Sequence, residues 1–301
     1  MNLEWLEDFV ALAETRNFSR AAERRNVTQP AFSRRIQALE EWLGARLFVR
    51  SPHKVGLTAA GEAVRGEAEA LLRAAYRFRS MVAEAARPAG TTLHFAATHS
   101  LSFSFFPGWI KETGQCLAHA GAAVNLISDT MASCEKALIR GEAQFLLCHA
   151  GATPPSRFTS TGFLSAVVGR DTLSPYAAPD STGAPLWHLD AEATPVQWLQ
   201  YSGESGFARM MEGHPNIVSR LAGSPPVVTS RLATVLLSMV EDGRGMAWLP
   251  SSLVGLAVEH GKIVAAGGPA WDIHMDIRLF RARATLSPVA ERLWAAISQK
   301  S

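Results

Sequence analysis

Gln29, Ser33 and Arg34 are the residues whose types and spacing say most about chemistry. Gln29 and Ser33 are four residues apart, as are Pro30 and Arg34, so one face of a helix would carry all four. Arginine and glutamine pair with base edges in the major groove of DNA, and serine binds bases or phosphates there. A helix face of this kind therefore predicts DNA recognition, with a surface helix carrying solvated arginines as the alternative.

The surrounding residues predict how that face is positioned. Phe32, Ile36, Leu39 and Leu43 recur at steps of four, three and four, which is the buried side of the same helix. A shorter apolar helix begins at Phe18 and precedes it. A turn at Asn26, a helix start at Thr28 and a proline in the first helical turn separate the two. Two short helices joined by a tight turn predict a helix-turn-helix.

A basic hairpin follows the predicted recognition helix. Residues 47–49 and 55–57 are β-prone, and Ser51 to Lys54 form a turn between them, so Arg50 and Lys54 lie on a wing. Residues 16–54 carry nine Lys/Arg against three acids, whereas the whole chain has a net charge of only +2. The positive charge is concentrated where phosphate would be met.

Residues 1–61 resemble the winged helix-turn-helix of LysR-type bacterial transcriptional regulators. The matching segments, at that family's spacing, are 21–22, 28–31, 33–34, 39–40, 43–44, 47–50 and 57–61. The resemblance implies a sequence-specific regulator that binds double-stranded DNA and is not an enzyme. DNA contacts are expected at Gln29, Pro30, Ser33, Arg34, Arg35, Arg50 and Lys54. One departure is Arg25, where the family usually has leucine.

Length and composition are those of an ordinary globular protein. The chain has 301 residues, of which 48% are hydrophobic and 19% charged, enough for two or three domains. No run approaches the roughly 18 apolar residues of a membrane span, and no secretory signal is evident. Cys116, Cys134 and Cys148 are odd in number and lack metal-site spacing, which fits a reducing cytoplasm. We therefore expect a cytoplasmic location, no membrane partner and no cofactor.

A heptad pattern predicts a long helix over residues 59–90. Its apolar positions step by four and three along Val64, Ala68, Leu71, Ala75, Phe78, Val82 and Ala85. An alternative is that this helix packs only on its own domain. Because the row of apolar residues is narrow, it favours packing against a partner helix instead. In the LysR family the equivalent linker helix pairs two subunits, and the resemblance implies a homodimer or homotetramer.

The rest of the chain alternates strands with helices, which predicts an α/β fold with parallel sheets covered by helices. The strands are expected at 93–97, 124–128, 143–148, 164–169, 196–201, 227–230, 245–249 and 273–281. Glycine- and proline-rich stretches suggest two effector subdomains, one of residues 91–162 and 268–301, the other of 163–267. This layout resembles the family's two-subdomain effector domain, which has the architecture of periplasmic solute-binding proteins.

Such a fold holds its ligand between the subdomains, beside strand ends and helix starts. The expected effector-binding residues are Thr98, His99, Ser100, Ser102, Ser128, Tyr201, Ser202, Ser205, Thr229 and Arg231. Hydroxyls and an arginine suit a small anion such as a carboxylate. The alternatives are that Thr98 and Ser100 only cap a helix, and that Arg231 forms a surface ion pair.

Some segments also resemble the hypochlorite-responsive branch of the LysR family, notably 97–102 and 242–250. In that branch methionines of the effector domain are thought to be oxidised. The aligned positions here hold Phe207 and Arg231, which leaves oxidant sensing as an alternative. Cys148-His149 suggests a reactive thiolate, but a buried structural cysteine is favoured. A cytoplasmic two-domain enzyme is the alternative from a different class, and no catalytic motif supports it.

Overall fold

The computed structural model describes residues 2–51, 54–85, 92–113, 122–151, 162–190, 196–203 and 205–299. The chain divides into two units, residues 1–86 and residues 87–301, and each is described by itself. No helix in the described ranges is both long enough and apolar enough to cross a bilayer.

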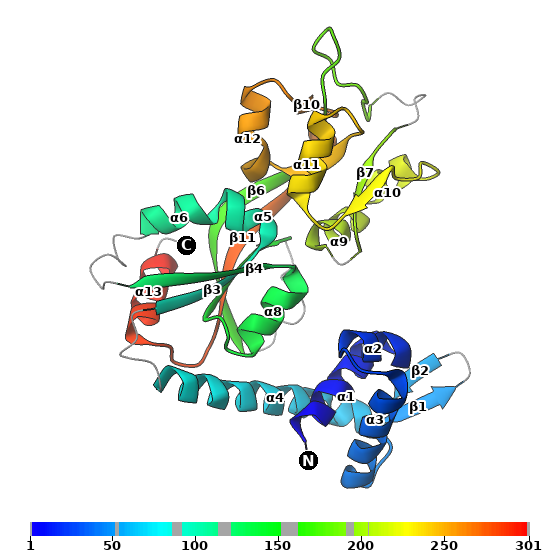
Figure 1. Ribbon diagram of the computed structural model, residues 1–301, viewed down its shortest axis with the longest axis vertical. Coiled ribbons are helices and arrows are strands. Elements are labelled where there is room, and N and C mark those ends of the chain that lie inside the picture. The colour runs from blue at the N-terminus through cyan, green and yellow to red at the C-terminus, as the bar shows by residue number, and fades with distance from the viewer. Residues whose placement is uncertain are drawn as a thin grey trace. The chain divides into compact units, whose positions relative to one another are not determined.

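The first unit contains the predicted winged helix-turn-helix (Figure 1). Its elements are α1 (Leu3–Thr15), α2 (Phe18–Arg24), α3 (Gln29–Leu43), β1 (Phe48–Ser51), β2 (Lys54–Leu57) and α4 (Ala59–Ala85). Asn26 takes a left-handed conformation with φ of 54° in the turn before α3, and Thr28 is the residue preceding that helix. Phe32, Ile36 and Leu39 are fully buried, as their spacing predicted.

α4 has two different apolar faces. Ala68, Leu72 and Tyr76 are buried within the unit, where α4 contacts α1. Further along the predicted heptad seam, Phe78 is 72% exposed and Val82 is 54% exposed. Leu72 and Tyr76 lie outside the predicted seam, so the face that packs on the helix's own domain differs from the seam. From Leu71 onward, the large apolar side chains of the seam face outward.

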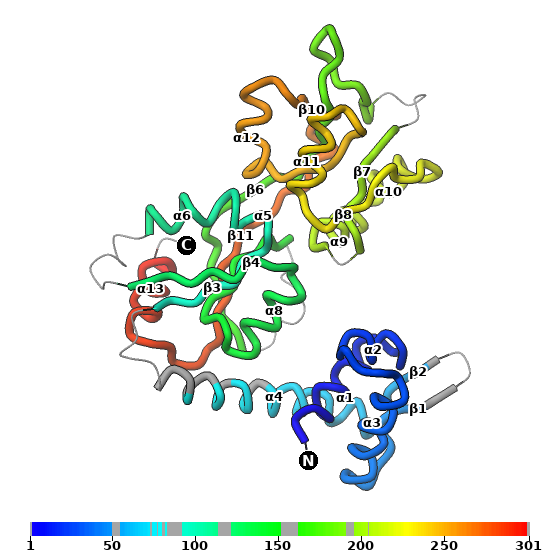
Figure 2. The backbone as a smooth tube through the Cα atoms, in the orientation of Figure 1, coloured from blue at the N-terminus to red at the C-terminus, as the bar shows by residue number. Residues whose placement is uncertain are grey.

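The second unit is built on a seven-stranded mixed sheet in the order β10-β6-β11-β5-β3-β4, with β9 paired to β6. These strands are β3 (Thr92–Thr98), β4 (Ala123–Asp129), β5 (Phe145–Ala150), β6 (Phe163–Ala177), β9 (Ala247–Pro250), β10 (Val264–Ala265) and β11 (Ile273–Ala282). The prediction of parallel pairing is correct for β3 with β4 and β5. It is wrong for β6 and β11, which run antiparallel to each other. They are antiparallel because β6 carries the chain away from the part of the unit that contains β3, β4 and β5, and β11 carries it back (Figure 2).

Helices and a second, two-stranded parallel sheet complete this unit. They are α5 (His99–Ser104), α6 (Phe106–Thr113), α8 (Met131–Ile139), β7 (Leu199–Tyr201), α9 (Gly206–Glu212), α10 (Pro215–Leu221), β8 (Val228–Ser230), α11 (Ala233–Glu241), α12 (Ser251–Glu259), the 3-10 turn η1 (Pro269–Trp271) and α13 (Pro288–Ser298). β7 pairs with β8.

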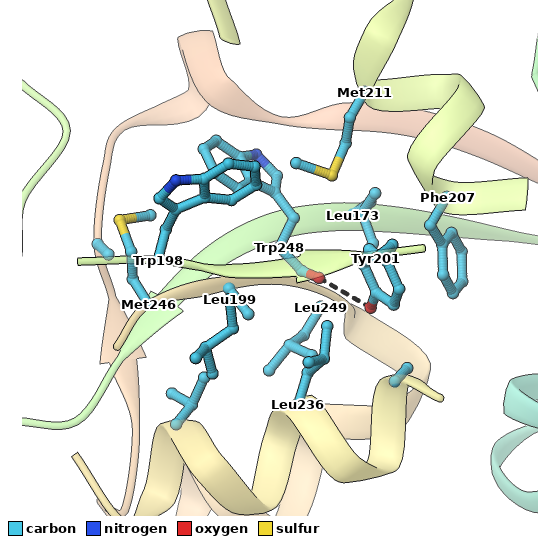
Figure 3. Close-up of a cluster of buried hydrophobic side chains, with 14 of the residues drawn as sticks. Leu173, Trp198, Leu199, Tyr201, Phe207, Met211, Leu236, Met246, Trp248 and Leu249 are labelled. Atoms are coloured by element: carbon cyan, nitrogen blue, oxygen red, sulfur yellow. Dashed lines mark hydrogen bonds between the residues drawn. The ribbon is translucent and has the colours of Figure 1, made fainter. Parts of the chain in front are cut away.

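Buried apolar side chains gather at two places in the second unit. The first core lies on both faces of β3 and β5 and includes Phe95, Leu101 and Leu146. The second core includes Leu173, Trp248 and side chains from β7, α9, α11 and α12 (Figure 3). The subdomain boundaries expected near residues 162 and 268 remain a prediction. The side chains change from one core to the other within β6, between Val168 and Leu173, and within β11, between Met275 and Ile277.

Arg281 fastens the C-terminal helix to the sheet. It is 2% exposed, its Nη1 lies 2.6 Å from Glu291 Oε2, and its Nη2 lies 2.8 Å from Glu291 Oε1. The hydrogen bond from Arg281 holds the pKa of Glu291 below its usual value. A buried guanidinium needs such a partner, because an unpaired charge in the interior is strongly destabilising.

We expect Glu291→Gln to lower the free energy of unfolding by about 1–3 kcal/mol at neutral pH, because it removes a charged hydrogen-bond acceptor. Because the folded-state pKa is lowered, this stability is present above the ordinary glutamate pKa and is lost as pH falls through the folded-state value. Urea unfolding across pH would measure both effects. Glu142→Gln, in an exposed pair 4.0 Å from Arg140, is the matched control and should change little. Equal effects from the two variants would contradict a fastening role for Glu291.

Candidate DNA-reading surface and effector pocket

The outer face of α3 presents the polar residues that the spacing predicted. Gln29, Pro30, Arg34 and Gln37 are exposed, and Ser33 is half-buried. Arg34 Nε lies 3.4 Å from the carbonyl oxygen of Pro30, so the arginine side chain lies back along the helix. The side chains of Arg50 and Lys54 lie outside the described part of the structure, although their backbones form β1 and β2. All these DNA contacts remain predictions.

Arg35 has partners inside its own domain. Its Nη2 lies 3.4 Å from Glu4 Oε2 and its Nη1 lies 3.6 Å from Asp8 Oδ2. Asp8 is completely buried, so it benefits from cationic neighbours more than an exposed acid would. The prediction that Arg35 contacts DNA therefore competes with a structural role in joining α3 to α1.

Arg25, the departure from the family pattern, is explained by the same acids. Its Nε donates to Asp8 Oδ1 at 2.6 Å, and its Nη2 forms a short hydrogen bond to Glu7. Burial would lower the pKa of Arg25, but the hydrogen bond to Asp8 and the charge of Glu7 raise it above the usual value. α2 is thus tied to α1 by an ionic contact where leucine would pack.

Glu40 positions the wing. It is 5% exposed, and its Oε1 accepts from the backbone nitrogens of Leu47 at 2.7 Å and Phe48 at 3.1 Å. This carboxylate joins the end of α3 to the start of the hairpin. Sequence reasoning missed the contact, because an acid in the last turns of a helix usually faces solvent.

Arg34→Gln and Arg35→Gln should behave differently. We expect Arg34→Gln to weaken binding to a selected duplex by about 10- to 100-fold with unchanged unfolding, because a base contact is lost. Arg35→Gln should instead lower the free energy of unfolding by about 1–3 kcal/mol, because Asp8 loses a charged neighbour. Fluorescence anisotropy with labelled duplex and urea unfolding would measure the two effects. Weaker DNA binding by Arg35→Gln at unchanged stability would restore Arg35 as a DNA contact.

Three of the expected effector-binding residues form a cluster in the second unit. His99 Nδ1 lies 3.1 Å from Ser128 Oγ, and Ser102 Oγ lies 2.6 Å from the same oxygen. Ser102 also donates to the carbonyl oxygen of His99 at 2.9 Å. The first turn of α5 and the end of β4 are therefore brought together, because β3 and β4 are neighbouring parallel strands.

Three more of the expected residues carry hydroxyls with unused hydrogen-bonding capacity. Thr98 Oγ1, Ser100 Oγ and Ser202 Oγ are buried and have no hydrogen-bond partner within the described residues. Thr98 precedes α5, yet its side chain makes no capping bond, so the capping alternative is wrong for this residue. Leaving such a group unpaired costs about 1–3 kcal/mol. Unpaired hydroxyls at the ends of β3 and β7 and in the first turn of α5 are what a ligand would satisfy.

The other expected residues contribute less to such a pocket. The hydroxyl of Tyr201 is used internally, because it donates to the carbonyl oxygen of Trp248 at 2.9 Å (Figure 3). Burial also raises the pKa of Tyr201. Ser205 Oγ accepts from the backbone nitrogen of Phe207 at 3.2 Å and so caps α9. Thr229 and Arg231 are exposed, and their roles remain predictions.

A buried polar network that sequence reasoning missed joins β5 to β6. His149 Nε2 is 2.8 Å from Asp171 Oδ2, and the ring of His149 lies 5.1 Å from that of Phe207. Phe207 in turn lies 5.2 Å from Tyr201, the neighbour of Ser202. Burial would raise the pKa of Asp171, but the hydrogen bond from His149 and others hold it far below the usual range.

The sheet register aligns Thr98 with Cys148 and places His149 one residue further along β5. Ala97 of β3 pairs with Leu147 of β5, so the next residues along the two parallel strands are Thr98 and Cys148, followed by His149. Neighbouring strands are about 4.8 Å apart. The ends of β3 and β5 are therefore adjacent. Because side chains alternate along a strand, Thr98 points to the face of Cys148 and His149 to the opposite face. The sequence singled out His149 only as a neighbour of Cys148, and Asp171 had no recognisable signal.

The two cysteines in the described residues are poor candidates for redox chemistry. Cys134 and Cys148 are free and buried. Burial raises the pKa of Cys134 to about 12 and raises that of Cys148 further. A thiol with a raised pKa is not ionised near neutral pH and is a weak nucleophile. A reactive thiolate at Cys148-His149 is therefore not supported, and no potential metal-binding group of three His, Cys, Asp or Glu occurs in the described ranges.

Comparison with known proteins decides the family. Residues 3–62 match the family described as bacterial regulatory helix-turn-helix protein, lysR family, and residues 86–301 match the LysR substrate binding domain. The chain belongs to the LysR family of bacterial transcriptional regulators. It is a DNA-binding regulator with an effector-binding domain, and not an enzyme.

The LysR relatives are similar over nearly the whole chain. The HTH-type transcriptional regulator YjiE of Escherichia coli is 30% identical over 299 residues, which are 98% of this chain and 94% of that protein. The structure of Vibrio fischeri DarR in complex with DNA is 28% identical, with a TM-score of 0.60, and covers 100% of this chain and 99% of its own. Full-length HypT from Salmonella typhimurium, a hypochlorite-specific LysR-type regulator, is 25% identical, with a TM-score of 0.60 and coverage of 99% and 97%.

Proposed function

We propose that this regulator reads its operator with Gln29, Pro30, Ser33 and Arg34 of α3 and responds to a small anionic effector in the second unit. The proposal of an effector site is supported by three buried hydroxyls that have no hydrogen-bond partner among the described residues. They belong to Thr98, Ser100 and Ser202. Hydroxyl donors at the ends of β3 and β7 suit the acceptor oxygens of a carboxylate. The reading of DNA rests on the exposed polar face of α3.

The protein acts as a pair of copies joined through α4. Leu71, Phe78 and Val82 are large apolar side chains exposed on one helix, at 49%, 72% and 54%. Pairing two such helices would remove this apolar surface from water. A second winged helix-turn-helix would also bind a second half-site of the operator, about one turn of the DNA helix from the first. A tetramer formed from two pairs is the larger assembly that the family resemblance implies.

Effector control requires two arrangements of the second unit. A ligand shifts such an equilibrium only by its preferential affinity for one of them. We infer that closure around the effector changes how the paired copies pack, and so changes the distance between their recognition helices. The DNA contacts themselves stay the same, while their spacing relative to the two half-sites changes.

Oxidant sensing has less support as an alternative. Met211 and Met246 are buried in the second core, and Met210 and Met239 pack against it partly buried. These thioethers fill the core, which is their usual role. Phe207, at one of the positions aligned with an oxidised methionine, contacts His149 and Tyr201 through its ring.

The pairing proposal is tested with Phe78→Glu. We expect its dimer dissociation constant to rise by about 1,000-fold, because burial of each Phe side chain contributes about 2 kcal/mol and each pair has two. Light scattering would measure the mass, and selection from a random duplex pool would measure specificity. The natural protein should select two related half-sites, and Phe78→Glu should not. Val218→Glu, at an exposed apolar residue of α10, is the control, and a Phe78→Glu variant of unchanged mass would refute pairing through α4.

The effector proposal is tested by a melting-temperature screen of small carboxylates on the full-length protein. A compound that stabilises it and alters operator binding should bind Ser100→Ala and Ser202→Ala about tenfold more weakly, because each variant loses one hydrogen bond. Ser219→Ala, on the exposed side of α10, should bind normally. Unchanged affinity in the Ser100 and Ser202 variants would place the effector elsewhere.

A further inference from the structure

Asp171 is a buried carboxylate that is saturated with hydrogen-bond donors. It is 4% exposed, and five donors lie within 3.1 Å of its oxygens. They are Thr172 N at 2.9 Å, Ser251 Oγ at 2.6 Å and Ser252 N at 3.1 Å on Oδ1, with His149 Nε2 at 2.8 Å and Ser252 Oγ at 2.6 Å on Oδ2. An ionised carboxylate only accepts hydrogen bonds. Every one of these neighbours must therefore present a hydrogen, including His149 Nε2.

This requirement fixes the tautomer of His149. A neutral imidazole carries one hydrogen, and if Nε2 holds it, then Nδ1 is the nitrogen with a free lone pair. Nδ1 of His149 has no hydrogen-bond partner among the described residues, and the residue keeps 8% of its surface exposed. The ring of His149 lies against that of Phe207 at the end of β5. Nδ1 is thus the nitrogen that can accept a hydrogen bond from a molecule outside the described residues.

The donors to Asp171 come from both cores of the second unit. β5, which carries His149, belongs to the first core, whereas α12, which carries Ser251 and Ser252, packs in the second core. Ser252 Oγ also lies 3.1 Å from Ser104 Oγ of α5, which belongs to the first core. One carboxylate on β6 therefore joins elements from both sides of the unit.

We propose that Asp171 is the positioning residue of the effector pocket. It holds His149 with Nε2 protonated, leaving Nδ1 for the effector, and it ties α12 and β5 into one arrangement around the pocket. The pocket part of this inference rests on the proposed function. The hydrogen-bonding part does not, because it concerns the protein without effector or DNA.

The tautomer is measured by NMR of the imidazole nitrogens in full-length protein labelled with ¹⁵N-histidine. The His149 signals are identified by their loss in His149→Gln. In the neutral form we expect hydrogen on Nε2 in the natural protein and a mixture of tautomers in Asp171→Asn. Asp276→Asn, on the adjacent strand β11, is the matched control and should leave the His149 tautomer unchanged. Hydrogen on Nδ1 in the natural protein, or the same tautomer in Asp171→Asn, would overturn the proposal.

The tie between the cores is measured by hydrogen exchange of the backbone amides. Asp171→Asn and Ser252→Ala should each speed exchange in residues 169–173 and 251–254 by about tenfold, because charged hydrogen bonds are lost. Ser252→Ala should keep the His149 tautomer, since that bond does not involve Ser252. Unchanged exchange in both variants would refute the tie.

If Asp171→Asn does not fold, two variants of His149 can test the hydrogen bond to Asp171 instead. His149→Gln retains a side-chain N–H for Asp171, so this variant should exchange like the natural protein in residues 169–173. His149→Leu has no donor and should exchange faster there. Equal exchange in the two variants would contradict the proposal. Failure of the Ser100 and Ser202 variants to affect effector binding would leave these measurements unchanged, so the two proposals fail independently.

Discussion

A carboxylate can be buried only where enough hydrogen-bond donors surround it, and in the second unit that constraint is met at Asp171. Its donors come from β5, β6 and α12, so satisfying one charge fixes the positions of three elements. The long antiparallel pair of β6 and β11 makes this possible, because β6 runs between the two cores. Packing at the end of β5 follows from it, since His149 held by Asp171 supports the ring of Phe207.

The first unit also buries a carboxylate, but it surrounds Asp8 with positive charge more than with hydrogen bonds. Asp8 Oδ1 accepts from Arg25 Nε, whereas Oδ2 has no hydrogen-bond partner among the described residues and lies 3.6 Å from Arg35 Nη1. Asp8 is fully buried in α1, and Arg25 and Arg35 approach it from α2 and α3. Both arginines contact acids of α1, and Arg25 makes the closer contact with Asp8. Arg34, one residue from Arg35, points along the outer face of α3 toward Pro30. Neighbouring arginines on one helix can therefore have different roles, which are decided by the acids that each can reach.

Elements with strong periodicity could be predicted from the sequence, and contacts that depend on the chain path could not. The buried side of α3 followed from Phe32, Ile36 and Leu39, because a helix repeats every 3.6 residues. Most strands were located, but the antiparallel course of β6 was missed, since its residues say nothing about strand direction. The contact of His149 with Asp171 spans 22 residues, and it exists only because β5 and β6 both flank β11. Three of the expected pocket residues, around Ser128, were brought together because parallel strands end at one edge of a sheet.

The groups that the fold leaves without partners indicate what the protein meets outside itself. An isolated chain gains nothing from apolar side chains facing water, yet α4 presents Phe78 and Val82 there. It gains nothing from buried hydroxyls without partners, yet within the described residues Ser100 and Ser202 carry them. Each feature has a cost in the free chain that a suitable partner removes: an apolar helix for the first, a ligand with acceptor oxygens for the second. Two such sites in one chain influence each other only where the ligand binds one arrangement of the paired copies more tightly than another, which is the condition for control of DNA binding by an effector.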